Sequence, residues 1–261
     1  MPIITLTSDL GDASHYPAII KGVILARCPA ATLIDVTHNI PSFDVMQAAY
    51  VLRHIYPAYP PGTIHVVAVD PEANGQPDGV VMRYRNQTFI GPDNGTLSLI
   101  ASGDVQQGYA IEHPEVLAPQ FPRSLRAARI LGPAAAFLAQ GGHMESLGAP
   151  VSLRDLRWGE PSYSSNCLRG KIIHIDKFGN AITNIRREGF LHLKQNRRFE
   201  IFIRNIRLRR IVNTYADVAK ADALAIFGEG DHLEIAMREA SAADLLGLKV
   251  HDMITIEFSG G

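Results

Sequence analysis

A five-residue loop at 176–180 combines a carboxylate, an aromatic ring, a glycine and an amide. Apolar and β-branched residues on either side of it, within 171–185, predict two strands joined by this loop. Asp176 can accept hydrogen bonds from hydroxyl or ammonium groups, and Asn180 can both donate and accept them. Two interpretations stay open. The loop is a ligand site, or it is a hairpin connection in which Gly179 supplies a positive φ and Asn180 bonds its own backbone.

Three further carboxylates stand near the ends of predicted strands in the first half of the chain. They are Asp9, Asp35 and Asp70. Any one of them alone is typical of a turn or a helix cap. Together they favour a polar ligand site, because functional side chains of a parallel sheet gather at the carboxyl ends of its strands.

The sequence lacks the motifs of several other chemistries. No GxGxxG follows the first predicted strand, and no phosphate-binding loop, GxSxG elbow or HExxH motif occurs. Cys28 and Cys167 are too far apart in sequence to suggest a metal site, and His174 is typical of a packed strand residue. We therefore expect no metal and no resident cofactor, and a neutral or cationic ligand that carries hydroxyl groups.

Strands and helices alternate over residues 1–150. Strand patterns at 2–10, 31–40 and 62–72 are separated by helical patterns at 16–28 and 43–57. This order predicts an α/β domain with a mostly parallel sheet covered on both faces. After an expected linker at 151–169, short strands dominate residues 170–261 and predict a smaller antiparallel β-barrel domain.

The composition is that of a globular protein. The chain has 261 residues, 46% hydrophobic and 20% charged, with a net charge of −1. Such a charge gives no general attraction to nucleic acid or to anionic membranes. No apolar run approaches the roughly 20 residues of a membrane span, and the N-terminus is a poor secretory signal. We expect a cytoplasmic protein that binds neither membrane nor nucleic acid.

Six motifs follow one another along the chain in an informative order. They are TSDLGD at 7–12, DVTHNIPSFD at 35–44, VVAVDP at 66–71, GPDNGTLS at 91–98, IDKFGNAITNI at 175–185 and LEIAMREASAADLLGLKVHD at 233–252. In these motifs the chain resembles the S-adenosylmethionine (SAM) hydroxide adenosyltransferase family, which also includes the fluorinase and chlorinase. The resemblance implies an α/β domain, a β-barrel and a homotrimer whose ligand lies between neighbouring subunits. It also implies attack of water, hydroxide or halide on C5′ of SAM.

The resemblance assigns roles to residues of the N-terminal half. Asp9 matches the aspartate that binds the ribose hydroxyls, and Phe43 falls where the halogenase packs a tryptophan on the ligand. Asp70 matches the aspartate that hydroxide-using members place near the reacting carbon. These members also carry an arginine seven residues later and a histidine before the PAAA helix. Here those two positions hold Pro77 and Arg126.

Arg126 is therefore a candidate catalytic residue beside Asp70. Its guanidinium could restore the missing positive charge and lower the pKa of a water or hold it in line, although it cannot act as a general base. A halogenase is disfavoured, because Arg126 aligns with the halide-binding serine. Asp70 aligns with a tyrosine near the reacting carbon, and its charge would oppose a halide.

In the C-terminal half the resemblance implies a nucleoside contact surface. Asp176 matches the carboxylate that contacts the methionine ammonium, and Asn180 matches an adenine contact. Tyr215 falls at an aromatic position that lines the adenine, and the backbone near Glu239 and Ala240 falls where main-chain groups read the adenine edge.

The chain departs from the family pattern at 228–232, where the family usually has serine and this chain has GEGDH. The acidic groups Glu229 and Asp231 would repel a substrate carboxylate. They either point outward from an acidic surface turn or indicate a substrate tail without a carboxylate. Two functions stay open: hydrolysis of SAM or a close analogue to adenosine and the thioether, or a catalytically weak sensor that binds adenosine or SAM.

Overall fold

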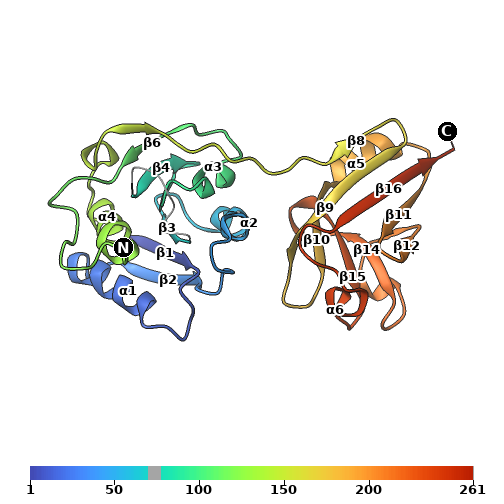
Figure 1. Ribbon diagram of the computed structural model, residues 1–261, viewed down its shortest axis with the longest axis horizontal. Coiled ribbons are helices and arrows are strands. Elements are labelled where there is room, and N and C mark those ends of the chain that lie inside the picture. Colours follow the sequence, from blue (N-terminus) through green and yellow to red (C-terminus); the bar gives the residue numbers. More distant parts are fainter. Residues whose placement is uncertain (70–77, 261) are drawn as a thin grey trace. The chain divides into compact units, whose positions relative to one another are not determined.

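The computed structural model describes residues 1–69 and 78–260, so Asp70 and Pro77 lie outside the described residues. The chain divides into a first unit, Met1–Trp158, and a second unit, Gly159–Gly261. Figure 1 draws both units. The segment 151–169, expected as a linker, contains strand residues near both of its ends, which pair within the first and the second unit respectively.

In its described residues the first unit contains a seven-stranded sheet in the order β2-β1-β3-β5-β4-β6-β7. The strands are β1 (Ile3–Ser8), β2 (Thr32–Thr37), β3 (Ile64–Ala68), β4 (Val80–Tyr84), β5 (Gln87–Gly91), β6 (Gln107–Ala110) and β7 (Pro150–Ser152). The run β2-β1-β3-β5 is parallel, and the remaining pairings are antiparallel. The sheet is therefore mixed, and the expectation of a mostly parallel sheet holds for one side of it.

A tight turn explains why β4 departs from the parallel order. Only Arg85 and Asn86 separate β4 from β5, and both have positive φ, 49° and 62°. Two residues in this conformation form a primed hairpin turn, which allows only antiparallel neighbours. The register Tyr84 opposite Gln87 follows directly from that turn.

Helices cover both faces of this sheet. The helical segments are α1 (Tyr16–Arg27), α2 (Val45–Ile55), η1 (Tyr56–Ala58), α3 (Thr96–Ile100), the π-helix η2 (Ala127–Leu131), α4 (Gly132–Ala139) and η3 (Met144–Ser146). One core, with Ile4, Ile24 and Leu131, lies under α1 and α4, and a second, with Leu52 and Phe89, lies under α2 and α3. Figure 1 shows these two helix pairs on opposite sides of the strands.

The second unit is a curled sheet around a main core, with a smaller buried cluster of Val212, Leu224, Ile226 and Ala236. Its strands are β8 (Ser162–Tyr163), β9 (Cys167–Ile175), β10 (Ala181–Arg186), β11 (Arg198–Ile203), β12 (Ile206–Leu208), β13 (Ile211–Val212), β14 (Ala223–Phe227), β15 (His232–Met237) and β16 (Met253–Ser259). The order is β12-β11-β16-β9-β10-β15-β14-β13, with β8 on β9. Six strands contribute to the same core, and β12 approaches β14, so the sheet is nearly barrel-shaped.

Most of these pairings are antiparallel, as expected, while β13 and β14 run parallel. Short helical segments complete the unit: α5 (Arg187–Lys194), η4 (Tyr215–Asp217), η5 (Glu229–Asp231) and α6 (Ala242–Leu246). In residues 1–69 and 78–260 no helix is long and apolar enough to cross a membrane.

Candidate functional site

Asp9 and Phe43 meet in the first unit. Asp9 follows the last residue of β1, and its Oδ2 accepts a hydrogen bond of 2.9 Å from the backbone N–H of Phe43. Phe43 has a φ of 67°, and 71% of its side chain is exposed. A large exposed ring in a left-handed backbone conformation is uncommon. The pair therefore presents a carboxylate beside an uncovered flat apolar surface.

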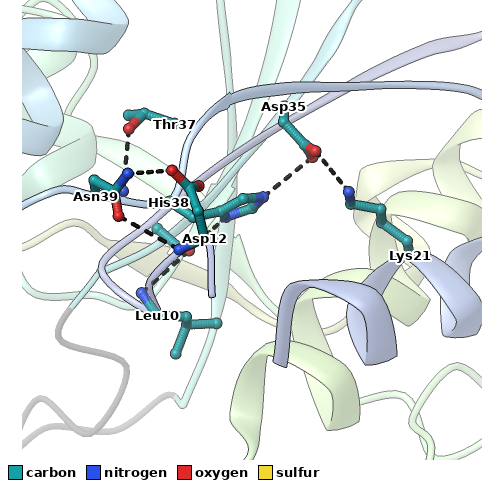
Figure 2. A network of polar contacts seen from close by, with 8 residues as sticks. Leu10, Asp12, Lys21, Asp35, Thr37, His38 and Asn39 are labelled. Carbon is teal, nitrogen blue, oxygen red and sulfur yellow. Dashed lines mark hydrogen bonds and ion pairs between the residues drawn. The ribbon is translucent and has the colours of Figure 1, made fainter. Parts of the chain in front are cut away.

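A chain of polar contacts lies immediately before Asp9. Ser8 Oγ lies 2.7 Å from Nδ1 of His38, and both residues are buried. On the other side of the ring, His38 Nε2 lies 3.1 Å from Oδ1 of Asp35, an ion-pair distance without hydrogen-bond geometry. Lys21 binds the same carboxylate at 2.6 Å. Figure 2 shows the His38 ring turned toward Asp35, with Lys21 beyond it.

In this series of contacts, the partners of Asp35 are the side chains of Lys21 and His38 and not a ligand. Burial acts to raise the pKa of Asp35, but its contacts with Lys21 and His38 outweigh burial and hold that pKa below its usual range. Asp35 lies within β2 and is part of the support behind Asp9. The spacing of residues in the sequence does not predict the contact between His38 and Ser8, because this contact depends on how β1 and β2 pair.

Arg126 directly precedes the π-helix η2 as its N-cap residue and forms an ion pair with Asp78, at 3.2 Å between Nη1 and Oδ1. Asp78 is the first described residue after the gap at 70–77. The part that Asp70 plays therefore stays a prediction. Val69, just before it, is anchored by Asn94, which donates a 2.9 Å hydrogen bond from Nδ2 to the Val69 carbonyl. This contact explains the asparagine in GPDNGTLS.

In the second unit the loop at 176–180 is closed by its own aspartate. Asp176 Oδ1 accepts hydrogen bonds from the backbone N–H groups of Phe178 and Asn180, at 2.9 and 2.8 Å. Its Oδ2 accepts from Asn180 Nδ2 at 2.9 Å. Gly179 has a φ of 82°, as the hairpin interpretation expects. A carboxylate has about four acceptor sites, so three internal bonds still leave room for one ligand donor.

Tyr215 lies near this loop and contacts a buried carboxylate. Its hydroxyl donates to Oε2 of Glu234 at 3.1 Å. Burial, followed by the charge of Glu234, raises the pKa of Tyr215 to about 12. Burial also raises the pKa of Glu234, and the charges of Asp176 and Glu229 add to this rise against the opposing hydrogen bond from Tyr215. Sequence reasoning missed Glu234, which alternates with apolar residues like an ordinary strand position.

The turn after β15 is also connected to this loop, through the helix that follows it. Glu239 has a positive φ of 52°. Its side chain lies at the surface, where it forms an ion pair with Lys220 at 2.9 Å. Ala240 bridges back to Met237. Helix α6, which follows, donates the N–H of Ala243 to the carbonyl of Gly179 at 2.8 Å. These contacts connect the turn to the loop that carries Asn180.

The acidic turn at 228–232 forms η5. Asp231 forms an ion pair with Arg187 at 2.9 Å, and the side chains of both residues are largely exposed. Glu229 is exposed as well. These contacts favour the interpretation of an acidic surface turn over that of a substrate without a carboxylate. Among the described residues, no group of three or more His, Cys, Asp or Glu side chains could hold a metal ion.

The predicted residues thus form two groups, one in each unit. Asp9 and Phe43 contact one another in the first unit, where Arg126 has its own partner in Asp78. The second group is the loop with Asp176 and Asn180, together with the turn at Glu239 and Ala240, which is connected to the loop through α6. Tyr215 belongs to this group because the charge of Asp176 acts on its hydroxyl.

Family models match nearly the whole chain. The N-terminal domain of the SAM hydroxide adenosyltransferases matches residues 4–148, and the C-terminal domain matches residues 170–255. The chain belongs to the SAM hydroxide adenosyltransferase family. The resemblance in the six sequence motifs is thereby confirmed.

Characterised relatives of this adenosyltransferase-family chain include enzymes of two kinds. A protein of Thermus thermophilus named (R)-S-adenosyl-L-methionine hydrolase is 30% identical over 93% of this chain and 94% of its own. A protein of the same name from Salinispora tropica is 28% identical over 98% and 97%. A fluorinase of an Actinoplanes species is 26% identical over 71% of this chain and 72% of its own.

A solved structure of an uncharacterised conserved protein from Thermotoga maritima superposes with a TM-score of 0.86. It is 30% identical in sequence and covers 97% of this chain and 99% of its own. The similarity supports the fold of this family member over its full length.

Proposed function

We propose that this chain is a SAM hydrolase that uses water to displace methionine from C5′ of the substrate and releases adenosine. The observation that carries the proposal is the similarity to two (R)-SAM hydrolases over more than nine tenths of both chains. The fluorinase relative covers less of the chain at lower identity, which favours water over halide as the nucleophile.

The reaction forms one bond and breaks one. The water oxygen bonds to C5′ while the C5′–S bond breaks, and its electron pair moves to sulfur and removes the sulfonium charge. One proton leaves the attacking water for solvent. The leaving thioether is neutral and stable, so it needs no activation by the protein. The protein needs to align the attacking water, remove its surrounding solvent and stabilise the charge that develops.

Two residues are proposed to act on the water. Asp70 would accept a hydrogen bond from it and direct its lone pair toward C5′. Arg126, held by its ion pair with Asp78, would place a positive charge where developing hydroxide character is stabilised. This role needs no proton transfer by the guanidinium, which stays charged at working pH.

The remaining residues are proposed to hold the nucleoside. Asp9 would accept the ribose hydroxyls, and Phe43 would pack on the ligand. Asp176 has one acceptor site left for the methionine ammonium. Asn180, Tyr215 and the backbone near Glu239 and Ala240 would contact the adenine.

The two groups of residues belong to separate units, and a neighbouring copy could supply the second group. We therefore also propose a cytoplasmic homotrimer in which the first unit of one subunit and the second unit of the next complete each site. The family resemblance of the six motifs supports this arrangement.

The test combines product analysis with an isotope. Purified protein is incubated with the R and S sulfonium epimers of SAM in ¹⁸O-labelled water, and adenosine and methionine are separated by chromatography. We expect turnover of the R epimer with the label in the 5′-hydroxyl of adenosine. Asp70→Ala should lower the rate at least about a hundredfold, and Arg126→Ala about tenfold or more.

Asp155→Ala is the matched control, since Asp155 is an exposed aspartate of the same unit paired with Arg157. It should leave the rate unchanged. Adenosine binding by calorimetry without any product from the wild-type protein would favour the sensor function instead. Turnover that survives Asp70→Ala would remove Asp70 from the mechanism.

A further inference from the structure

We propose that His38 is a positioning residue for the sugar site, acting through Ser8 on the turn that carries Asp9. The inference rests on the proposed function, because it assumes that Asp9 accepts the ribose hydroxyls. It adds a second layer of residues, Ser8, His38 and Asp35, that touch no ligand themselves. We expect these residues to control how strongly the protein prefers a ligand with two neighbouring hydroxyl groups over one that lacks them.

The first step concerns the direction of the hydrogen bonds. Asp35 lies 3.1 Å from Nε2 of His38 and carries a negative charge balanced by Lys21, so a proton on Nε2 is favoured there. Nδ1 is then an acceptor, and the Ser8 hydroxyl donates to it across 2.7 Å. The Ser8 oxygen remains an acceptor, and it receives the backbone N–H of Leu10 at 3.3 Å. The two hydrogen bonds therefore run in one direction, from Leu10 through Ser8 to His38, whose Nε2 faces Asp35.

The second step connects this chain of contacts to Asp9. Ser8 Oγ and the N–H of Leu10 enclose Asp9 in one short turn. The same turn is bound to the segment after β2 by two backbone hydrogen bonds, from Gly11 N–H to His38 carbonyl at 2.7 Å and from Ile40 N–H to Ser8 carbonyl at 3.2 Å. The carboxylate of Asp9 then receives the N–H of Phe43.

The third step is the burial of the chain of contacts. Only 2% of Ser8 and 4% of His38 are exposed, so neither side chain can serve as a ligand contact or as a nucleophile. Buried polar groups of this kind fix one backbone arrangement, because any other would leave them without partners. Removing the Ser8 hydroxyl should therefore let the Asp9 turn relax by a few tenths of an ångström, which is enough to weaken a two-point contact with vicinal hydroxyls.

A second series of buried side-chain contacts in the same sheet provides a matched control. Thr5, also on β1, lies 2.7 Å from Nδ1 of His65, and His65 Nε2 lies 2.7 Å from Gln87. It has the same contact between a hydroxyl and an imidazole Nδ1, at the same distance and with similar burial, but it ends on an amide and lies within the strands, away from Asp9. Thr5→Val thus removes a comparable hydroxyl without touching the turn.

The experiment measures binding of adenosine and of 2′,3′-dideoxyadenosine by calorimetry. We expect wild type to prefer adenosine, and Ser8→Ala and His38→Ala to reduce that preference about three- to tenfold, as loss of one hydrogen-bonded support implies. His38→Asn, whose amide reaches Ser8 as Nδ1 does, should retain most of the preference. Thr5→Val should retain all of it, and fluorescence of Trp158, the one tryptophan, reports folding of each variant.

The outcomes separate the two proposals. If wild type prefers adenosine and Ser8→Ala keeps the same preference as Thr5→Val, the positioning role of His38 is wrong while the proposed function stands. If wild type binds both nucleosides equally, or neither, Asp9 is not the sugar contact and this inference falls, while the hydrolase function is decided separately by product formation from SAM. A rise in KM for SAM with unchanged kcat in Ser8→Ala would support the inference independently.

Discussion

At the scale of single residues, Glu234 works against the stability of the second unit once it ionises. Its pKa is raised by burial and by the charges of Asp176 and Glu229. A carboxyl with a raised pKa in the folded state contributes stability below its ordinary pKa of 4.5, which is lost as pH rises through the folded value. The hydrogen bond from Tyr215 favours the charged form, but burial and the neighbouring negative charges outweigh it.

Glu234→Gln should therefore be more stable, relative to wild type, at pH 7 than at pH 4. The glutamine oxygen can still accept the Tyr215 hydroxyl, so the substitution removes the charge and keeps the hydrogen bond. Thermal unfolding of both proteins at the two pH values measures the difference. Equal midpoint differences at pH 4 and pH 7 would contradict the shift in pKa.

His65 gives the opposite dependence in the first unit. Burial lowers its pKa from 6.5 to about 4, against an opposing hydrogen bond from Gln87. The unfolded chain therefore binds a proton that the folded one excludes, and stability falls as pH drops from 6.5 toward 4. The loss reaches about 3 kcal/mol. Urea unfolding followed by Trp158 fluorescence should show a shallower pH dependence for His65→Gln, while the exposed control His143→Gln should follow wild type.

At the scale of elements, the loop at 176–180 and helix α6 form one structural piece. Gly179 has a φ of 82°, and a Cβ at this position would lie 2.1 Å from Oγ of Ser241, the residue that caps α6. The carbonyl of Gly179 also receives the N–H of Ala243. The proposed adenine contact of Asn180 thus depends on a close approach that only glycine permits.

Gly179→Ala should destabilise the second unit by about 2–4 kcal/mol, because it adds a steric clash to the cost of a left-handed backbone. Gly247→Ala is the matched control: it has a φ of 66°, but its nearest neighbour lies 3.8 Å away. It should cost about 1–2 kcal/mol from the backbone alone. Chemical unfolding of both variants measures the difference, and equal losses would show that the approach to Ser241 is unimportant.

The helices and strands also show which elements the hydrophobic pattern of the sequence predicts well. Helical periodicity at 16–28 and 43–57 predicted α1 and α2 with small errors at their ends, because each helix buries one apolar face. The orientation of β4 was not predicted. It depends on two residues with positive φ, Arg85 and Asn86, and of these only the asparagine is a residue type that favours such a turn.

At the scale of the whole molecule, the chain consists of two units with separate cores. The proposed site needs residues of both units, and in the proposed trimer they come from neighbouring subunits. Symmetric oligomers of this kind repeat one interface around a ring. A measured mass near three times 28.5 kDa would support the trimer.

Mixing two inactive variants tests the shared site. Asp9→Ala and Asn180→Ala each damage one half of every site, and subunit exchange in an equal mixture should restore about one site in four. Activity of the mixture is compared with that of each variant alone. A mixture without recovered activity, despite mass-spectrometric proof of exchange, would contradict a site shared between subunits.

The sequence by itself determined the family, the two-part organisation and most of the strands, because ordered motifs and periodic burial are local properties of the chain. Only the tertiary structure decided which buried side chains meet. Ser8 reaches His38 because β1 and β2 pair in parallel with a register shift between Leu6 and Thr7. Tyr215 meets Glu234 because β13, which precedes Tyr215, lies two strands from β15 in the sheet, with the register Val212, Ile226 and Glu234. Such contacts join residues far apart in sequence, and their geometry depends on register and curvature, which composition and periodicity do not specify.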